Sequence, residues 1–189
     1  TNGMSLSKRN SRHANSGLVV SIEPADLEGA GFTGTLGGLR FQRQLEVRAF
    51  EAGGGKLQAP ATRATDFVAG RASSSVPDSS YLPGLTPSNV RDVLDAGGLP
   101  LAERLATALG EFDRRMRGYL TEEAVLVGVE SRSSSPVRVV RDDESLESPS
   151  LAGLYPCGEG AGYAGGIVSA AVDGARVAEV ISKKWGKAS

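Results

Sequence analysis

The chain of 189 residues is poor in the side chains on which many active sites depend. A single cysteine, Cys157, excludes an intrachain disulfide, a Cys-x-x-Cys redox pair and a multi-cysteine zinc site. A single histidine, His13, excludes an HExxH metal site and leaves one candidate base for a Ser-His triad. These absences remove much of the usual enzyme repertoire before any motif is considered.

Neither charge nor aromatic content indicates a nucleic-acid or membrane partner. The 21 basic and 22 acidic residues give a formal net charge of −1, so no attraction to nucleic acid or to an anionic membrane is expected. Aromatic residues make up only 5%, which leaves few rings on which unpaired bases could stack. All apolar runs fall well short of the ~18 residues that a membrane-spanning helix requires. We therefore expect no nucleic acid and no membrane span.

Glycine, in contrast, is abundant. Glycine accounts for 25 of the 189 residues, a share well above the usual one of about 7%. Many of the glycines lie between Gly153 and Gly174. The first residues, TNGMSLSKR, place Met4 internally and show no signal-peptide pattern. We expect the chain to be a segment of a longer protein.

Hydrophobic periodicity predicts three helices, at residues 36–52, 101–116 and 167–183. The first ends at a run of glycines, which commonly terminate helices. The third is apolar nearly all round, so it is predicted to be buried on several sides. The apolar positions are Phe41, Leu45 and Ala49 in the first helix and Leu101, Leu105, Ala108, Leu109, Phe112 and Met116 in the second.

Four short apolar and β-branched runs are predicted to be strands, at residues 16–22, 124–129, 136–141 and 154–157. In the run 136–141, Arg138 and Arg141 are expected to face outward. The first and second runs are expected to be buried.

Residues 53–98 fit no regular pattern, because prolines and serines interrupt it. Such a length without structure indicates an insertion or a functional loop. Within it, residues 66–69 are candidates to pair with a strand elsewhere. Thr86 or Ser88 is expected to cap a short helix that runs through Leu94.

The glycine-rich segment 158–166 carries the strongest chemical motif. Gly160, Gly162 and Gly165 satisfy the spacing GxGxxG, with a predicted strand before and a predicted helix after. Glycines allow close approach of backbone to a ligand, and the N–H groups of the first helical turn can hold a negatively charged oxygen. The alternative is a tight strand-to-helix turn that binds nothing.

The motif does not open an ordinary Rossmann fold. That fold needs a second parallel strand after the helix and an acidic residue about 20 positions on for the ribose. The chain ends after the helix, and Glu179, the carboxylate at that distance, lies inside it. The sequence therefore predicts an α/β fold in which a C-terminal strand–turn–helix returns to a sheet formed elsewhere.

Three long strings carry a resemblance to a known family: LYPCGEGAGYAGGIVSAAVDGARVAEVI, ESRSSSPVRVVRD at residues 130–142, and TNGMSLSKR with ANSGLVV near the start. They resemble the C-terminal half of a family of FAD-dependent dehydrogenases of bacteria and plastids, also called NAD(P)/FAD-dependent oxidoreductases. The wider group is the glutathione-reductase-like flavoproteins. The middle of the chain is similar only through short pieces such as FQRQLE and GGGKLQAP.

The resemblance implies a discontinuous, Rossmann-like FAD-binding domain with an α+β insert. Residues 1–23 would be a strand segment joining the FAD domain to the insert. Residues 24–123 would belong to the inserted substrate or cap domain, and residues 124–189 to the C-terminal part of the FAD-binding domain. The N-terminal FAD-binding half is missing and would be the partner, in the same or a separate polypeptide.

The resemblance also implies site residues. Glu159 would accept a hydrogen bond from a hydroxyl of the ribityl chain. The wider group more often has aspartate at this position. The N–H groups near Gly165, Gly166 and Ile167 would face the flavin pyrimidine edge and favour the negative charge that develops there. Arg132 and Ser133 match a motif usually written E-T-R-T-S-S-P, in which serines here replace the threonines. The full set of cofactor-binding candidates is Gly158, Glu159, Gly160, Gly162, Tyr163, Gly165, Gly166, Ile167, Arg132 and Ser133.

Some questions stay open at this stage. Tyr163 and Cys157 are each favoured as packing residues, and the lone cysteine excludes a disulfide-reductase mechanism. The principal hypothesis is a segment of an oxidoreductase that uses FAD, with NAD(P)H or an unknown reductant and an unknown small-molecule substrate. The alternatives are a non-catalytic scaffold or assembly subunit and, least favoured, a stand-alone nucleotide-binding domain. The lack of disulfides suits a reducing compartment, the plastid stroma or the bacterial cytoplasm, and the string KRNSRHANS is more similar to plastid than to bacterial relatives.

Overall fold

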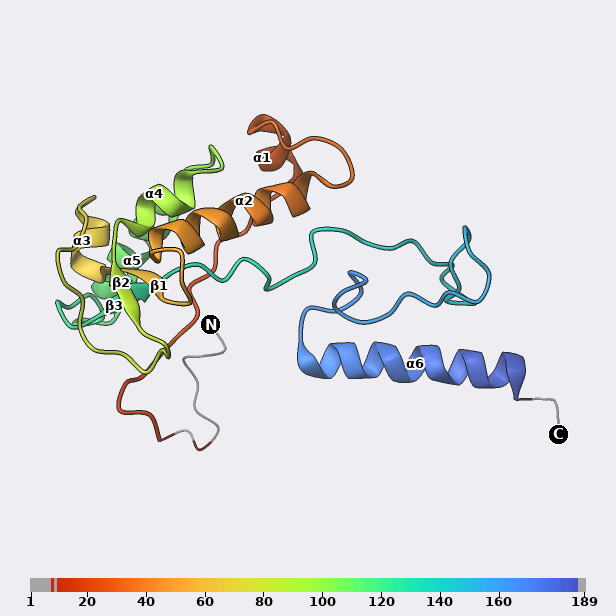
Figure 1. Cartoon of the computed structure of the whole chain (residues 1–189). Coiled ribbons are helices and arrows are strands. Elements are labelled where there is room, and N and C mark those ends of the chain that lie inside the picture. Colours follow the sequence, from red (N-terminus) through yellow and green to blue (C-terminus); the bar gives the residue numbers. More distant parts are fainter. Residues whose placement is uncertain (1–7, 9, 187–189) are drawn as a thin grey trace. The chain divides into compact units, whose positions relative to one another are not determined.

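The computed structural model describes Lys8 and residues 10–186. Apart from Lys8, the string TNGMSLSKR therefore lies outside the described residues. The chain divides into two compact units, which Figure 1 shows in one view. The first comprises Arg40–Ser131 together with the described residues up to Thr33, and the second comprises Gly34–Leu39 with the described residues from Arg132 onward. The chain is a mixed α/β protein, as its sequence predicts.

The first unit is organised around a sheet of three short strands. These are β1 (Ala59–Arg63), β2 (Leu85–Pro87) and β3 (Val125–Val127), in the order β2-β1-β3. Strand β1 pairs in parallel with β2 and antiparallel with β3. Of the four predicted strands, β3 is the one that forms within its predicted range, and its residues are half-buried rather than fully buried.

Pro60 lies in the central strand, a place where proline usually removes a ladder hydrogen bond. Here the paired register of β1 with β3 begins only at Ala61, opposite Val127. Pro60 itself lies one residue beyond that register and uses only its carbonyl oxygen, which accepts a hydrogen bond from the Gly128 amide at 3.1 Å. The proline therefore costs the sheet little, and the sequence pattern gives too much weight to it as a strand breaker.

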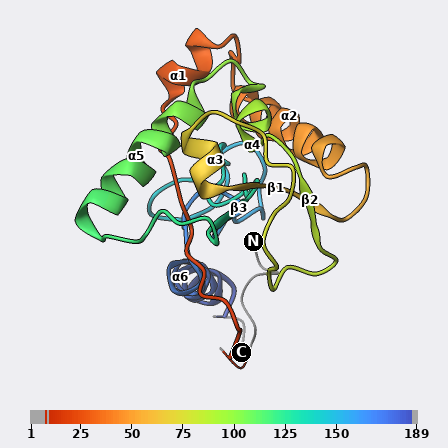
Figure 2. The same cartoon turned by 90° about the vertical axis from the view of Figure 1, so that its left-hand side faces the viewer.

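Five helices lie wholly or mainly in the first unit: α1 (Pro24–Gly29), α2 (Gly37–Ala52), α3 (Ala64–Val68), α4 (Val90–Asp95) and α5 (Leu101–Arg115). The first three residues of α2 belong to the second unit. Figure 2 shows α2 and α5 flanking the part that carries the sheet, α3 and α4. The core brings together apolar residues from α2 to α5 and the loop before α5. Its buried members are Phe41, Leu45, Phe67, Val90, Leu94, Leu99, Leu101, Ala102, Ala106 and Leu109.

The two long helices of this unit are confirmed by the structure. Helix α2 covers residues 37–52 of the predicted 36–52, and Phe41, Leu45 and Ala49 are all buried. Helix α5 ends one residue before Met116, and Met116 is exposed rather than part of the buried face.

The stretch 53–98 is more regular than its prolines suggest, since it contains β1, α3, β2 and α4. The prediction that residues 66–69 pair with a strand is wrong, because Ala64–Val68 form α3 and bury Phe67 in the core. The predicted short helix exists as α4. Its cap is Asn89, whose side-chain oxygen accepts a hydrogen bond from the Arg91 amide at 3.3 Å, rather than Thr86 or Ser88.

Residues 16–22 do not form the predicted buried strand. They are irregular, and their side chains alternate between half-buried Leu18, Val20 and Ile22 and exposed residues such as Val19, which is 81% exposed. The three half-buried side chains pack against the core. The alternation is real, but no strand of the described chain pairs with this segment.

Gly97 shows how tightly the first unit is packed, and it gives a testable prediction. A Cβ at Gly97 would lie 2.3 Å from Cε2 of Phe41, whose ring is 2% exposed. We expect Gly97→Ala to lower the free energy of unfolding by about 1–3 kcal/mol, the usual cost of overpacking a core, as measured by urea denaturation. Gly110→Ala is the matched control, because nothing lies within 4 Å of that Cβ on α5, and it should stabilise the helix by about 0.5–1 kcal/mol. Equal stability of the Gly97 variant and the parent would contradict this packing.

The second unit contains one long helix, α6 (Ile167–Trp185), and irregular segments that precede it. The helix confirms the prediction for residues 167–183, and Lys183 and Lys184 lie in its last turn. The predicted strands at residues 136–141 and 154–157 are wrong, because neither segment joins a sheet in the structure. No helix in the described part of the chain is long and apolar enough to cross a membrane.

Candidate functional site

The glycine turn, residues 158–166, connects an irregular segment to α6. Two backbone hydrogen bonds close it: the Gly162 amide donates to the Glu159 carbonyl at 2.9 Å, and the Tyr163 amide donates to the Gly158 carbonyl at 3.0 Å. Gly162 has φ of +83°, and a Cβ there would lie 2.5 Å from the carbonyl oxygen of Val137. Glycine is therefore required at position 162 by the fold of the turn itself.

Residues 135–141 lie along the glycine turn instead of forming a strand. The Val139 amide donates to the Ala161 carbonyl at 3.1 Å, and Nε of Arg138 donates to the Gly162 carbonyl at 3.0 Å. The Ser135 hydroxyl lies 3.4 Å from the Gly160 carbonyl and 2.8 Å from that of Val137. The Val139 amide of this segment thus bonds to the turn rather than to a neighbouring strand.

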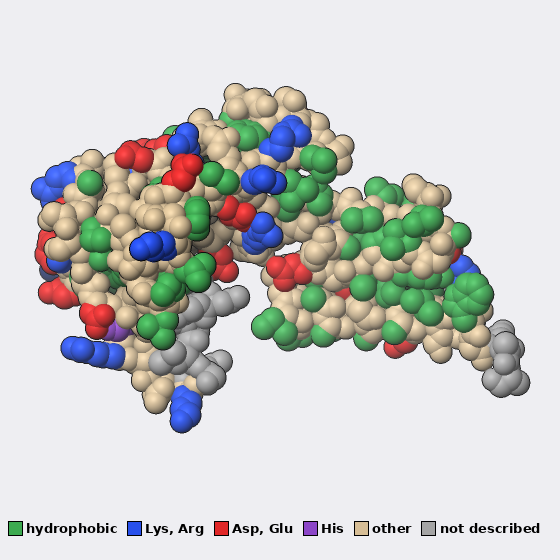
Figure 3. All heavy atoms as spheres, in the orientation of Figure 1, with side chains coloured by type: hydrophobic (Ala, Val, Ile, Leu, Met, Phe, Trp, Pro, Cys, Tyr) green, Lys and Arg blue, Asp and Glu red, His purple; other side chains and the backbone are tan. Residues whose placement is uncertain are grey.

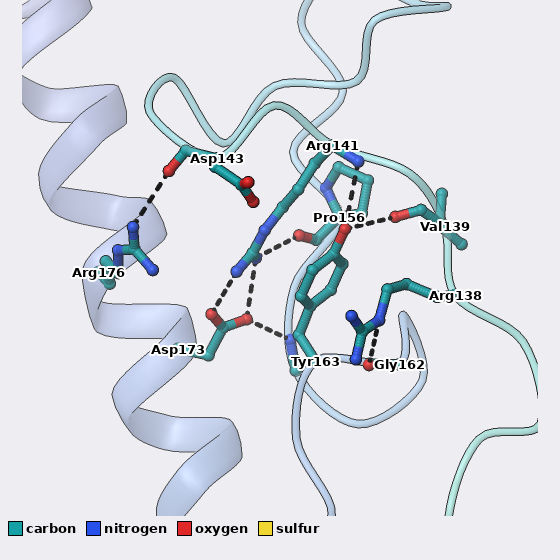
Figure 4. A network of polar contacts seen from close by, with 10 residues as sticks. Arg138, Val139, Arg141, Asp143, Pro156, Gly162, Tyr163, Asp173 and Arg176 are labelled. Atoms are coloured by element: carbon teal, nitrogen blue, oxygen red, sulfur yellow. Dashed lines mark hydrogen bonds and ion pairs between the residues drawn. The ribbon is translucent and has the colours of Figure 1, made fainter.

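Arg141 is the main correction to the sequence analysis, because it faces inward. Its side chain is only 4% exposed and pairs with Asp173 of α6, which is 12% exposed. The two guanidinium–carboxylate contacts are 2.6 and 3.0 Å, and Arg141 also donates to the Pro156 carbonyl at 2.7 Å. Figure 4 shows these contacts converging beside the turn. The pair fixes α6 to two segments that precede the turn, at Arg141 and at Pro156.

Asp173 contacts the glycine turn directly as well. Its carboxylate accepts a hydrogen bond from the Gly158 amide at 2.9 Å. The hydrogen bonds from Arg141, reinforced by this amide, hold the pKa of Asp173 below its ordinary value, and the carboxylate in turn raises the pKa of Arg141. A single carboxylate among the apolar residues that open α6 was the signal in the sequence, since such a group needs a buried partner.

Tyr163 has a structural position in the turn. Its hydroxyl accepts a hydrogen bond from the Arg141 amide at 3.2 Å and donates to the Val139 carbonyl at 3.1 Å. The guanidinium carbon of Arg141 lies 3.6 Å from the ring centroid and that of Arg138 lies 5.0 Å from it. A ring that contacts two guanidinium groups stabilises them through cation–π attraction, so the geometry agrees with the packing role that the sequence favours for Tyr163.

The start of α6 is open to solvent. Ile167 is 92% exposed and Val168 is 76% exposed. The N–H groups of a first helical turn have no acceptor within the helix, and here the Gly166 amide donates to the Ser169 hydroxyl at 3.1 Å. The Ser169 hydroxyl therefore already accepts the hydrogen bond of the Gly166 amide, which is one of the amides expected to face the flavin. Ser169 was not among the residues predicted from the sequence.

The apolar surface of α6 is exposed, so the prediction that several sides are buried is wrong for this chain by itself. Val177 is the buried residue of the helix. In Figure 3, several hydrophobic side chains lie on the visible surface of the second unit. The exposed large apolar residues of α6 are Ile167, Val168, Val172 and Trp185.

The remaining candidates lie at or near the turn. Glu159 and Gly160 are exposed within it, and Arg132 and Ser133 are exposed in the segment that precedes Ser135. A Cβ at Gly165 would lie 3.9 Å from the Ser134 hydroxyl oxygen, so the RSSS segment and the turn are neighbours. Cys157 is an exposed free thiol. Among the described residues, no group of three or more His, Cys, Asp or Glu side chains could hold a metal ion.

Comparison with known sequences decides the family. A sequence model of the family described as "FAD-dependent protein, C-terminal domain-like" matches residues 1–133. The chain belongs to this family. The match ends close to Ser131, where the first unit ends, and it includes the middle of the chain, where the resemblance rested on short pieces. The family description identifies the C-terminal region of an FAD-dependent protein and names neither a substrate nor NAD(P)H.

A relative from Clostridium beijerinckii extends the similarity to the glycine turn. This protein, described as uncharacterized, is 43% identical over 187 residues, which are 98% of this chain and 34% of the relative. The chain therefore spans about a third of the length of that relative. The aligned length includes the turn and most of α6, which lie beyond the family match.

Proposed function

We propose that this chain supplies the flavin-facing C-terminal part of an FAD-dependent oxidoreductase, in which the glycine turn and the start of α6 contact the flavin. Membership in an FAD-dependent family supports the cofactor. The observation that carries the placement is the solvent-open helix start beside the turn, with Ile167 92% exposed. A helix N-terminus of this kind favours a negatively charged or electron-rich group.

The glycines of the turn separate into two kinds, which fits a cofactor-binding loop. Gly158 and Gly162 have φ of +71° and +83°, so they shape the backbone. Gly160 and Gly165 have ordinary φ, and a Cβ at Gly160 would meet nothing within 4 Å. The fold of the turn does not require glycine at these two positions, whereas close approach of a flat ring system would.

The side chains around the turn suit the polar parts of FAD. The exposed carboxylate of Glu159 would accept a hydrogen bond from a hydroxyl of the ribityl chain. Arg132 with Ser133 would contact flavin oxygens or an anionic substrate. The amides near Gly165 and Ile167 would orient the pyrimidine edge. The bound flavin would supply the hydride chemistry, while these residues would bind and orient it. The proposal assigns no electron donor and no substrate.

The partner in this proposal is the N-terminal FAD-binding half of the protein. The chain spans 34% of its Clostridium beijerinckii relative, and the second unit exposes the apolar side chains of α6. Apolar side chains that are exposed together on one helix commonly mark a contact with another protein part. We expect the rest of the polypeptide to cover α6 and to bind the ADP portion of FAD.

Flavin binding tests the proposal. We expect this chain alone to bind FAD weakly, and expect the rest of the Clostridium beijerinckii relative, supplied as a second chain, to restore a bound-flavin absorption spectrum. Gly165→Val should then lower the flavin content at least tenfold, because its side chain would occupy the space of the ring, without changing the circular dichroism. Gly29→Val is the control, since a Cβ there meets nothing within 4 Å. Two chains that associate without retaining flavin would favour the scaffold alternative, and unchanged flavin in the Gly165 variant would refute the placement.

A further inference from the structure

The apolar stripe of α5, together with Met116 just after the helix, is only partly covered by the core. Leu101, Ala102, Ala106 and Leu109 are buried. Leu105, Ala108, Phe112 and Met116 are half-buried or exposed, with Met116 51% exposed. This uncovered part of the stripe is available to contact another molecule.

The uncovered part of the stripe lines a groove. Residues 16–19, the irregular segment described above, form the opposite wall, and the groove has a volume of about 280 Å³. This volume is just below the range of about 300–1,000 Å³ for small-molecule pockets. None of the described side chains that line it is charged.

Two hydroxyl groups lie together in the groove. The Ser16 and Tyr119 hydroxyl oxygens are 3.2 Å apart, and both residues line the groove. The Tyr119 ring packs edge-on against Phe112, with centroids 5.7 Å apart, which holds the phenol in place. A hydroxyl pair can both donate and accept, and it carries no charge at neutral pH.

We propose that this groove binds an uncharged, mainly apolar small molecule whose single hydroxyl or carbonyl group meets Ser16 and Tyr119. An apolar lining with few polar groups is the usual composition of such sites, and a charged ligand would lose its hydration here without gaining a partner. As a binding site the groove does not depend on FAD. The further step, that this ligand class is the substrate of the proposed oxidoreductase, rests on the proposed function.

The direct test uses the uncharged fluorescent probe N-phenyl-1-naphthylamine with this chain. We expect its emission to rise on binding, and expect decan-1-ol to displace it at a concentration at least tenfold lower than decanoate, which differs mainly in its charged end. Displacement by decanoate at equal or lower concentration would overturn the proposal. This readout contains no flavin, so its failure and the failure of the proposed function are distinguishable.

Three variants locate the site. Ala108→Trp should fill the groove and weaken probe binding at least tenfold, while Thr107→Trp, which adds the same bulk at the adjacent exposed position of α5, should leave binding unchanged. Tyr119→Phe removes one oxygen atom and should weaken displacement by decan-1-ol several-fold without affecting the probe. Equal binding by the two tryptophan variants would place the probe elsewhere and overturn the proposal, as would loss of probe binding when the rest of the Clostridium beijerinckii relative is added, because the groove would then be a protein contact.

Discussion

Asp173→Asn is expected to unfold the second unit under conditions in which the first unit remains folded. The substitution leaves the guanidinium of Arg141, only 4% exposed, without its carboxylate. Removing one partner of a buried ion pair commonly costs about 3–5 kcal/mol, which is a large part of the stability of a whole small domain. The large apolar residues buried in this unit are Leu146 and Val177, so little else compensates.

Limited proteolysis measures this effect. Cleavage within residues 132–186 should accelerate at least tenfold in Asp173→Asn, and the helical circular dichroism of α6 should fall. Glu179→Gln is the matched control, because it neutralises an exposed carboxylate of the same helix. Arg141→Met combined with Asp173→Leu should recover part of the loss, since removing both charges avoids the unpaired one. Parent-like proteolysis of the single variant would contradict the buried pair.

The same pair predicts how the second unit responds to acid. Because the pKa of Asp173 is lowered by Arg141, its contribution to stability is fully present above the ordinary value near 3.8 and is lost as the pH falls through the lower value of the folded protein. Asp142 and Glu147, whose pKa values are also lowered by hydrogen bonds from Ser145 and Gly153, add to the loss in the same direction. Proteolytic protection of this unit should therefore be constant from pH 7 to about 5 and decrease below it, because the ordinary pKa of Glu147 is 4.5.

Gly162→Ala is expected to disrupt the glycine turn. The new methyl group would lie 2.5 Å from the Val137 carbonyl oxygen and 3.0 Å from Cα of Arg138, both of which are backbone atoms. The φ of +83° adds a conformational cost of about 1–2 kcal/mol for a residue with a side chain. The turn can relieve the overlap only by separating from residues 137–139.

Hydrogen exchange is the measurement for this variant. The Val139 amide, which donates to Ala161, should exchange at least tenfold faster in Gly162→Ala. Gly160→Ala is the control two residues away, where the methyl group meets nothing within 4 Å, and its exchange should match the parent. If the two variants exchange alike, the contact between the turn and residues 137–139 is not as described.

The helices were predictable from sequence because their apolar spacing is a local property. Helix α2 shows this best, since Phe41, Leu45 and Ala49 are buried at the predicted spacing. The strands were less predictable, because pairing depends on a partner that the run itself does not specify. Residues 136–141 have the composition of a strand, yet they hydrogen-bond to the glycine turn instead.

The position of the glycine turn was predictable from its motif, whereas the residues that hold the turn in place, Arg141 and Asp173, were not. Arg141 lies in an alternating run that suggests an outward side chain, and its partner Asp173 is 32 positions away. The prediction that α6 is buried on several sides was also wrong for this chain. The apolar sequence of a helix indicates that it packs against another part of the protein, but it does not indicate which part.

The contacts of Asp173 have a mechanical consequence. One carboxylate joins α6 to Arg141 and to the Gly158 amide at the start of the turn, so the position of the helix and the position of this amide are linked. We therefore expect a protein part that packs on the apolar side of α6 and shifts the helix to shift the Gly158 amide as well.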